Sequence, residues 1–311
     1  MKQIFSMLMI LSVLFITACS EQEHETAVRH DLGTAHVAAH PQRVAVLNPG
    51  FNDILHDLGI KPVAAADNRT ERNDGSPSVG PPSHPDLKKI TSLKPDLIIA
   101  DSSLHKGIYR QLTKIAPTIA LKNEAADYQD AVDAALTIEK AVGKDGIIEK
   151  QLSAQEEKLN DIKRKLDAEG GTILLIDAAN DSISVKDDQF FTSRLLTLAG
   201  FTYAVQTDSG GKSDSIKMTS GQLLHTDPDY IVLLDGEKEL EKNHLWKQLT
   251  AVKNGHVYRA DRAVWTERRS IDGADAILHD LQKKTARQKG PKLNSGLFVM
   301  ILIGGCLHCN L

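Results

Sequence analysis

The sequence has few of the features that stabilise or anchor a chain by themselves, and each shortage excludes a class of protein. Its three cysteines, Cys19, Cys306 and Cys309, lie at the two ends, so no disulfide framework can hold the middle of the chain together. The apolar runs 4–16 and 297–303 are both shorter than the roughly 20 residues that a membrane-spanning helix needs. Stability must therefore come from the burial of an ordinary hydrophobic core.

Motifs of several functional classes are also missing. Neither Gly-x-Ser-x-Gly nor the dinucleotide-binding Gly-x-Gly-x-x-Gly occurs, and Gln206 stands where a phosphate-binding loop ending at 211–213 would need glycine. Cys306 and Cys309 are only half of a zinc ligand set, so we expect no metal site. A net charge of −4 without a basic stripe of interleaved aromatics argues against nucleic acid as a partner.

The amino terminus has the pattern of a secreted protein. The apolar run 4–16 leads through small residues to Ala18 and Cys19, after which the chain turns polar. This pattern resembles a bacterial lipobox, which implies a signal peptide over 1–18 and a lipid on Cys19. We therefore expect residues 19–35 to be a polar tether that holds the protein on the extracytoplasmic face of the bacterial cell membrane.

One phrase occurs twice in the body of the chain. Pro-Asp is followed by an unbroken apolar run and then by aspartate in 95–101 and in 228–235. Upstream of each copy, at 43–48 and 172–177, another apolar strand enters a polar turn. Apolar runs without alternation are typical of strands covered on both faces, as in parallel sheets. The repeated plan predicts an α/β fold with two lobes.

A long helical segment separates the two copies. Apolar residues at helical spacing run through 128–166, and the only glycines there are Gly143 and Gly146, which predicts two successive helices crossing between the lobes. Each lobe is expected to hold a parallel-type sheet with flanking helices. The expected divisions are an N-terminal lobe at 36–127, connecting helices at 128–170, a C-terminal lobe at 171–287 and an atypical tail at 288–311.

Candidate binding residues are mostly cationic or aromatic and gather where strands end. Ser103 is expected to cap a helix with the apolar stripe Leu104, Ile108, Leu112 and Ile115. Arginine grips carboxylates with a planar fork, so several converging arginines would bind a polyanion. The alternative is that they are solvated surface arginines paired with neighbouring Glu and Asp, such as Glu267. The candidate set is Arg69, Arg72, Ser102, Ser103, His105, Tyr109, Arg110, Lys186, Arg262, Trp265, Arg268 and Arg269.

Two stretches carry a family resemblance. His-Pro-Gln-Arg-Val-Ala-Val-Leu at 40–47 and Leu-Lys-Pro-Asp-Leu-Ile-Ile-Ala-Asp-Ser-Ser at 93–103, with Ile-Ala-Pro at 115–117, are similar to substrate-binding lipoproteins of iron–siderophore ABC importers. The resemblance covers about 30–285 and is especially strong to ferric dicitrate-binding proteins. It implies two lobes joined by a long backbone helix, in a binding protein rather than an enzyme.

The resemblance also implies a ligand and partners. Iron(III) dicitrate would bind between the lobes and pass to a membrane permease with its cytoplasmic ATPase. Citrate would wrap the iron, so no side chain need ligate the metal and no cofactor is expected. By position, Arg262 and Arg269 match arginines that hold the dicitrate anion, and Trp265 matches an aromatic of the same turn. Leu104 and Glu267 stand where relatives often carry arginine, which makes the site less positive.

Two alternative functions remain open, and the docking surface differs from the family pattern. Another siderophore or haem is the first alternative, although haem would want an apolar slot and an axial ligand. A secreted enzyme acting on an anionic substrate is the alternative of another class. The resemblance also implies a glutamate on each lobe that meets arginines of the permease. Lys88 and Gly221 stand at those positions, with Asp86 as a possible substitute for the first.

Overall fold

The computed structural model describes residues 25–67, 75–123, 127–166, 170–179, 182–207, 215–235 and 237–288. The predicted signal peptide, the predicted lipid site Cys19, the candidate residues Arg69 and Arg72, and the tail from residue 289 onward lie outside these ranges. Within the described ranges, no helix combines the length and the apolar character needed to cross a membrane.

The N-terminal lobe is built on a four-stranded parallel sheet. Its strands run in the order β4-β3-β5-β6. They are β3 (Val44–Val46), β4 (Ala64–Ala65), β5 (Leu97–Asp101) and β6 (Thr118–Leu121). Every residue of these four strands is buried, as the unbroken apolar runs predict. Alternate residues enter separate cores, since Val44 and Val46 pack on one face of the sheet and Ala45 packs on the other.

In the described residues four helices accompany this sheet, and one expected helix is divided. They are α2 (Pro49–Asp57), α3 (Leu87–Ser92), α4 (Ser102–His105) and α5 (Tyr109–Leu112). The prediction of a single helix capped by Ser103 is wrong. Asp101 is the cap instead, because its carboxylate accepts hydrogen bonds from the backbone N–H groups of Ser103 at 2.8 Å and Leu104 at 3.2 Å.

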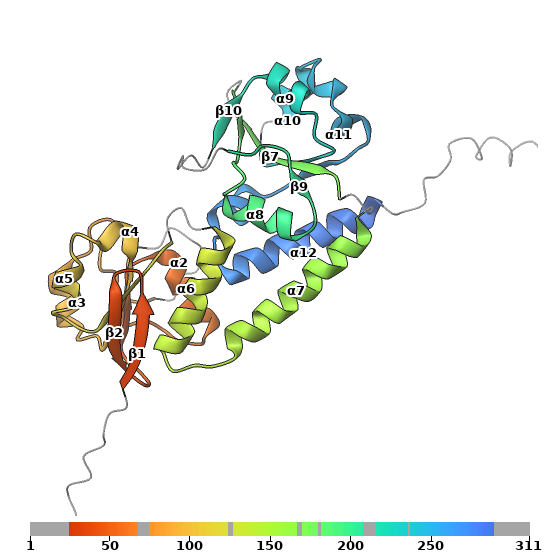
Figure 1. The fold of residues 1–311 in the computed structure, drawn as a ribbon. Coiled ribbons are helices and arrows are strands. Elements are labelled where there is room, and N and C mark those ends of the chain that lie inside the picture. Colours follow the sequence, from red (N-terminus) through yellow and green to blue (C-terminus); the bar gives the residue numbers. More distant parts are fainter. Residues whose placement is uncertain are drawn as a thin grey trace, which may run out of the picture.

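An antiparallel hairpin precedes the sheet, in a region expected to belong to the tether. Strands β1 (Glu25–His30) and β2 (Gly33–Ala38) pair along their whole length and stand in front of the lobe in Figure 1. Val28 and Val37 enter the core, and the backbone N–H of Asp31 donates to the carbonyl of Ala120 in β6 at 3.0 Å. The prediction of a tether is therefore wrong from Glu25 onward. The segment is polar and would bury little surface by itself, but pairing with β2 attaches it to the lobe.

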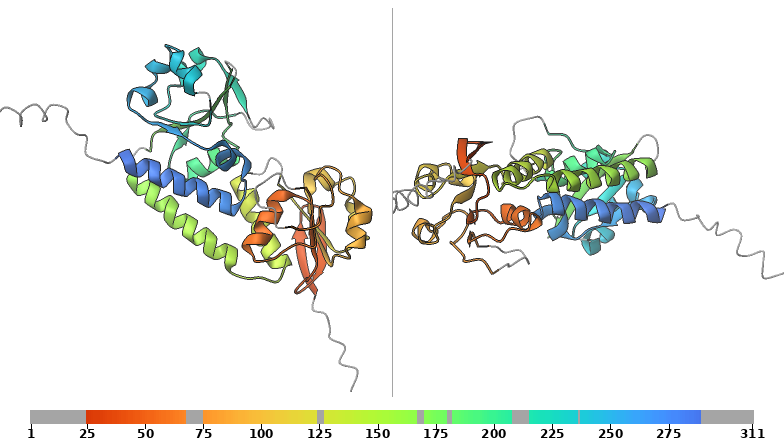
Figure 2. Two further views of the ribbon diagram at one scale, coloured as in Figure 1. Left: turned by 180° about the vertical axis from the view of Figure 1, so that it is seen from behind. Right: turned by 90° about the horizontal axis from the view of Figure 1, so that it is seen from below.

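The connector contains the two predicted helices and a third helix beside them. These are α6 (Tyr128–Ala141), α7 (Ile147–Lys165) and α12 (Ile271–Gln288), the last helix of the described chain. Helices α7 and α12 lie side by side in Figures 1 and 2. An ion pair joins Lys158 of α7 to Asp275 of α12, and Gln282 donates to Asp161 at 2.8 Å. The C-terminal helix thus stiffens the connection between the lobes.

The C-terminal lobe holds a mixed sheet. The order is β10-β8-β7-β11-β12, with β9 paired to β7. Strands β7, β9, β11 and β12 are parallel, whereas β8 and β10 pair antiparallel. Their bounds are β7 Thr172–Ala179, β8 Ser182–Val185, β9 Thr202–Tyr203, β10 Ile216–Met218, β11 Tyr230–Leu233 and β12 Val257–Arg259. The repeated α/β plan is confirmed, with an antiparallel extension that the strand patterns did not predict.

Short helices surround this second sheet. They are α8 (Phe191–Leu198), α9 (Ser220–Thr226), α10 (Glu237–Lys242), η1 (Trp246–Gln248), α11 (Thr250–Lys253) and η2 (Ala263–Glu267). In Figure 1 the α4 end of the N-terminal lobe is turned toward the C-terminal lobe. Candidate binding residues therefore sit in strand-end turns of two lobes that a helical layer joins.

Candidate functional site

The ends of three strands in the N-terminal lobe are tied together by side chains. Asn48, after β3, donates through Nδ2 to Oδ2 of Asp101 at 2.9 Å. Asn123, after β6, donates in turn to Oδ1 of Asn48 at 2.6 Å. Asp101 is fully buried, so its carboxylate is satisfied within this network. These residues were missed as site components, although each lies at or just beyond the end of an apolar strand.

His105 belongs to the interior of the lobe. It is fully buried, and its Nδ1 accepts a hydrogen bond from the backbone N–H of Asp101 at 2.9 Å. Its Nε2 lies 2.7 Å from the carbonyl oxygen of Pro82, so Nε2 carries the proton and donates to that oxygen. Both ring nitrogens are used inside the protein, which makes His105 a structural residue rather than a ligand contact.

We expect His105→Ala to lower the free energy of unfolding by roughly 3 kcal/mol, because it leaves a buried N–H and a carbonyl unpaired and opens a cavity. Urea denaturation measures the change. The exposed His84 is the matched control, and His84→Ala should change stability by less than about 0.5 kcal/mol. Equally small effects of both substitutions would mean that His105 is loosely held and free to meet a ligand.

Ser102 and Tyr109 contact the turn of the N-terminal hairpin. The Ser102 hydroxyl donates to Oδ2 of Asp31 at 2.6 Å, and the Tyr109 hydroxyl lies 3.1 Å from Nε2 of His30. His30 Nδ1 accepts from the backbone N–H of Leu32, so Nε2 donates to Tyr109. Burial lowers the pKa of His30 and favours this neutral form, although Asp31 opposes the shift. The hairpin thus holds the turn that follows β5.

Among the candidate residues of this lobe that the structure describes, Ser103 and Arg110 face solvent. Both are exposed, on α4 and α5 respectively, and neither side chain is part of the strand-end network. The five candidate residues after β5 therefore divide in two. Ser102, His105 and Tyr109 hold the turn in place, whereas Ser103 and Arg110 remain accessible to a ligand.

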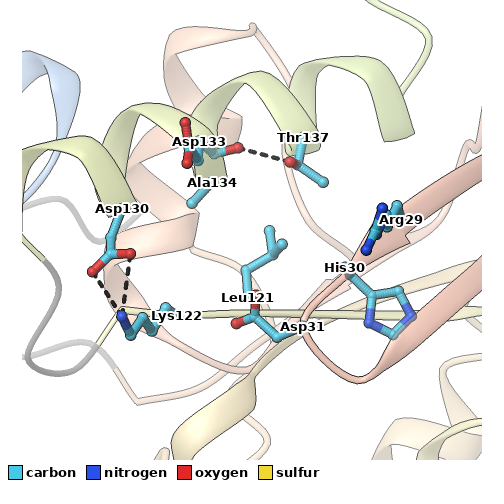
Figure 3. Close-up of a pocket in the computed structure, with 9 residues that line it drawn as sticks. All are labelled: Arg29, His30, Asp31, Leu121, Lys122, Asp130, Asp133, Ala134 and Thr137. Atoms are coloured by element: carbon cyan, nitrogen blue, oxygen red, sulfur yellow. Dashed lines mark hydrogen bonds and ion pairs between the residues drawn. The ribbon is translucent and has the colours of Figure 1, made fainter.

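A polar recess of about 370 Å³ lies beside the hairpin, between β1, the end of β6 and α6 (Figure 3). Lys122 pairs with both carboxylate oxygens of Asp130 across one end of it, at 3.1 and 3.3 Å. Asp31 connects the recess to Ser102. It is lined by Arg29, His30, Asp31, Leu121, Lys122, Asp130, Asp133, Ala134 and Thr137. In the described residues, no group of three His, Cys, Asp or Glu side chains could hold a metal ion.

Two candidate cations of the C-terminal lobe share one aromatic ring. Nζ of Lys186 and Cζ of Arg269 each lie 4.6 Å from the ring centroid of Phe190. Phe190 is 3% exposed and precedes α8, so the ring is a fixed support for both side chains. Cation–π attraction of this kind contributes about 0.5–1 kcal/mol at exposed sites and more where water is excluded. Lys186 and Arg269 are thereby brought together from separate strand-end segments.

Trp265 anchors the turn that carries the arginines. Its side chain is 1% exposed, its Nε1 donates to Oδ2 of Asp280 in α12 at 3.0 Å, and its carbonyl accepts from the hydroxyl of Thr192. In this conformation Trp265 positions the turn and does not face solvent. Arg268 follows close against α12, where a Cβ added at Gly273 would lie 2.2 Å from the Arg268 carbonyl oxygen.

Arg262 is held by two carboxylates from neighbouring strands. Its Nε donates to Oδ2 of Asp235, just beyond β11, at 2.9 Å, and its Nη2 donates to Oδ1 of Asp177, in β7, at 2.5 Å. These bonds, with Asp177 as the larger contributor, raise the pKa of Arg262 further above its ordinary value. The alternative of a paired surface arginine thus describes Arg262, and its partners come from segments far along the chain.

Comparison with known proteins identifies a family and several relatives. Residues 44–264 match the model of the periplasmic binding protein family. The chain is 51% identical over 318 residues to YhfQ of Bacillus subtilis (strain 168), which is provisionally named an ABC transporter substrate-binding lipoprotein. That alignment covers 91% of this chain and 98% of YhfQ. The Fe(3+)-citrate-binding protein YfmC of the same strain is 37% identical over 301 residues, covering 89% of this chain and 94% of YfmC.

The fold comparison agrees. The crystal structure of the petrobactin-binding protein YclQ of Bacillus subtilis superposes with a TM-score of 0.70 at 24% sequence identity, over 84% of this chain and 99% of YclQ. This likeness concerns the fold alone, because the identity is low. The family match over residues 44–264 and the identity to YhfQ and YfmC show that the chain belongs to the periplasmic binding protein family.

Proposed function

We propose that this protein is the extracytoplasmic binding component of an ABC importer and captures a ferric complex, with iron(III) dicitrate as the specific ligand. The observation that carries the proposal is the similarity to the Fe(3+)-citrate-binding protein YfmC over nearly the whole chain. The cationic strand-end groups support it, since Lys186 and Arg269 converge on one ring and Arg110 faces solvent from the other lobe. Guanidinium and ammonium groups suit the outer carboxylates of a citrate complex.

The iron needs no protein ligand in this proposal, because citrate supplies its coordination shell. Ferric ion is then cargo, and the side chains recognise the organic surface of the complex. The predicted lipid on Cys19 would hold the protein near its permease, and strand β1 begins close after it in the sequence, at Glu25. A short link of this kind keeps the binding protein at a high local concentration beside the membrane partner.

Isothermal titration calorimetry of the purified body with ferric dicitrate, iron-free citrate and free ferric ion tests the proposal. We expect saturable binding of ferric dicitrate and much weaker binding of iron-free citrate, since the site recognises the assembled complex. Native mass spectrometry should show the mass of the intact complex on the protein. A protein that binds ferric ion and ignores citrate would contradict the proposal.

The same titrations separate the alternatives. Tight binding of haem, or of another ferric siderophore with no response to dicitrate, would keep the binding-protein function and replace the ligand. Tryptophan fluorescence is a poor readout here, because Trp265 is buried against α12 and need not touch a ligand. Calorimetry is preferable because it does not depend on where a reporter side chain lies.

A further inference from the structure

The cluster of Asp177, Asp235 and Arg262 lies at the ends of adjacent strands in the C-terminal lobe. Asp177 belongs to β7, Asp235 follows β11 and Arg262 follows β12, and these strands are neighbours in the order β7-β11-β12. Two carboxylates and one guanidinium carry a formal charge of −1. The sequence predicts that Arg262 binds an anion, but with its two carboxylate partners the cluster carries a net negative charge.

The two carboxylates differ in exposure. The Asp177 side chain is 20% exposed, whereas that of Asp235 is 57% exposed and that of Arg262 is 40% exposed. Asp177 therefore lies deeper and fixes the guanidinium, while Asp235 presents part of its charge to solvent. An incoming carboxylate would meet Asp235 at the same place at which it meets Arg262.

The hydrogen bonds leave a limited surface for a ligand. Arg262 uses Nε and Nη2 for the two aspartates, and neither of these hydrogen bonds involves its Nη1. One guanidinium edge can thus accept an anion, beside a carboxylate that repels it. Hydroxyl, amide and ammonium groups suffer no such repulsion, since carboxylate oxygens accept their hydrogen bonds.

We infer that Asp177 and Asp235 determine ligand specificity by forming a negative charge filter around Arg262. The filter lowers the affinity of this end of the site for a carboxylate, so a bound ferric complex presents a neutral or cationic hydrogen-bond donor here and turns its outer carboxylates toward cations elsewhere, such as Arg269. This inference rests on the proposed function for the nature of the ligand. The charge balance of the cluster itself rests only on the three residues and their contacts.

Asp235→Asn tests the filter, because it removes the exposed negative charge and keeps the size of the side chain. Removing one like charge at close range in water should tighten binding of an anion about fivefold. We expect that gain for ferric dicitrate by calorimetry, and for iron-free citrate by NMR shifts of the backbone amides of 261–263. Asp177→Asn is a second variant, in case the change at Asp235 disturbs the fold.

The control is Asp145→Asn, which alters the net charge equally at an exposed position in the loop between α6 and α7. It should leave both affinities within about 1.5-fold, which the distance and salt screening predict. A gain for citrate without binding of ferric dicitrate would support the filter and reject the proposed ligand. Unchanged or weaker citrate binding in folded Asp235→Asn and Asp177→Asn variants would overturn the filter and assign the aspartates to positioning Arg262.

Discussion

Replacing Arg269 with alanine is expected to weaken ferric dicitrate binding by roughly 2–5 kcal/mol, the range measured when one partner of a desolvated charge pair is removed. The guanidinium lies 4.6 Å from the Phe190 centroid, so the ring holds it in place before the ligand arrives. A pre-positioned cation loses little conformational entropy on binding. Calorimetry measures the loss, and thermal unfolding verifies that the variant remains folded.

Two variants make this result specific. Arg164→Ala removes an arginine that is 70% exposed on α7, away from the strand ends, and should leave binding unchanged. Arg269→Lys keeps the charge but loses the planar fork, so its affinity should lie between those of the natural protein and the alanine variant. Equal losses from Arg164→Ala and Arg269→Ala would mean that general surface charge, and not a pocket, attracts the ligand.

The elements that could be predicted are those whose signal is local. The unbroken apolar run of β5 and its copy in β11 give the strands, because a buried parallel strand needs apolar residues on both faces. The helical spacing through α6 and α7, with Gly146 at a φ of 81° between them, gives the connector. Each of these patterns can be seen within one continuous stretch of the sequence.

The hairpin and the divided helix depend on partners that a local window does not contain. Strand β1 reads Glu-Thr-Ala-Val-Arg-His, without the regular polar–apolar alternation of a half-buried strand, and its pairing with β2 and the contact of Asp31 with Ala120 make it part of the body. At the end of β5 two residue types could cap the helix. Asp101 takes that role because Asn48 holds its carboxylate in place.

The site was harder to predict than the fold, because contacts with residues far along the chain decide which of its side chains are accessible to a ligand. Arg262 is neutralised by Asp177 and Asp235, which lie 85 and 27 positions away. Trp265 was expected to line the ligand site, yet its side chain is buried and bonded to Asp280 of α12. Residue type and position after a strand identify the region of a site, whereas contacts between segments decide which members can meet a ligand.

The largest expected effect on transport concerns docking to the permease. The family resemblance implies a glutamate near the start of α3 and another near the start of α9, each meeting arginines of the membrane partner. Lys88 and Gly221 stand there, so one charge is reversed and the other is absent. Like charges placed opposite each other slow association and lower affinity. We therefore expect slow delivery through a permease that carries the standard arginines.

The structure indicates whether Asp86 can replace the missing glutamate and whether glutamates can be introduced at Lys88 and Gly221. Asp86 is the cap of α3, and its Oδ1 accepts from the backbone N–H groups of Lys88 at 3.0 Å and Lys89 at 3.1 Å, which limits its use as a substitute. Lys88 and Gly221 are both exposed. A Cβ at Gly221 would meet only the Thr219 hydroxyl oxygen, at 3.9 Å, and glutamate in the first turn of a helix is favourable. A double glutamate variant should therefore fold normally.

Uptake of ferric dicitrate should rise about tenfold when Lys88→Glu is combined with Gly221→Glu, since complementary rim charges accelerate association by at least that factor. Radioactive iron uptake in a strain with a standard ferric dicitrate permease measures it. The control pair, Lys144→Glu with Lys247→Gln, changes the net charge equally at two other exposed positions and should leave the rate unchanged. Natural protein that already transports as fast as the double variant would show that docking does not depend on these glutamates. Similar gains from both pairs would attribute the effect to net charge, because only position distinguishes them.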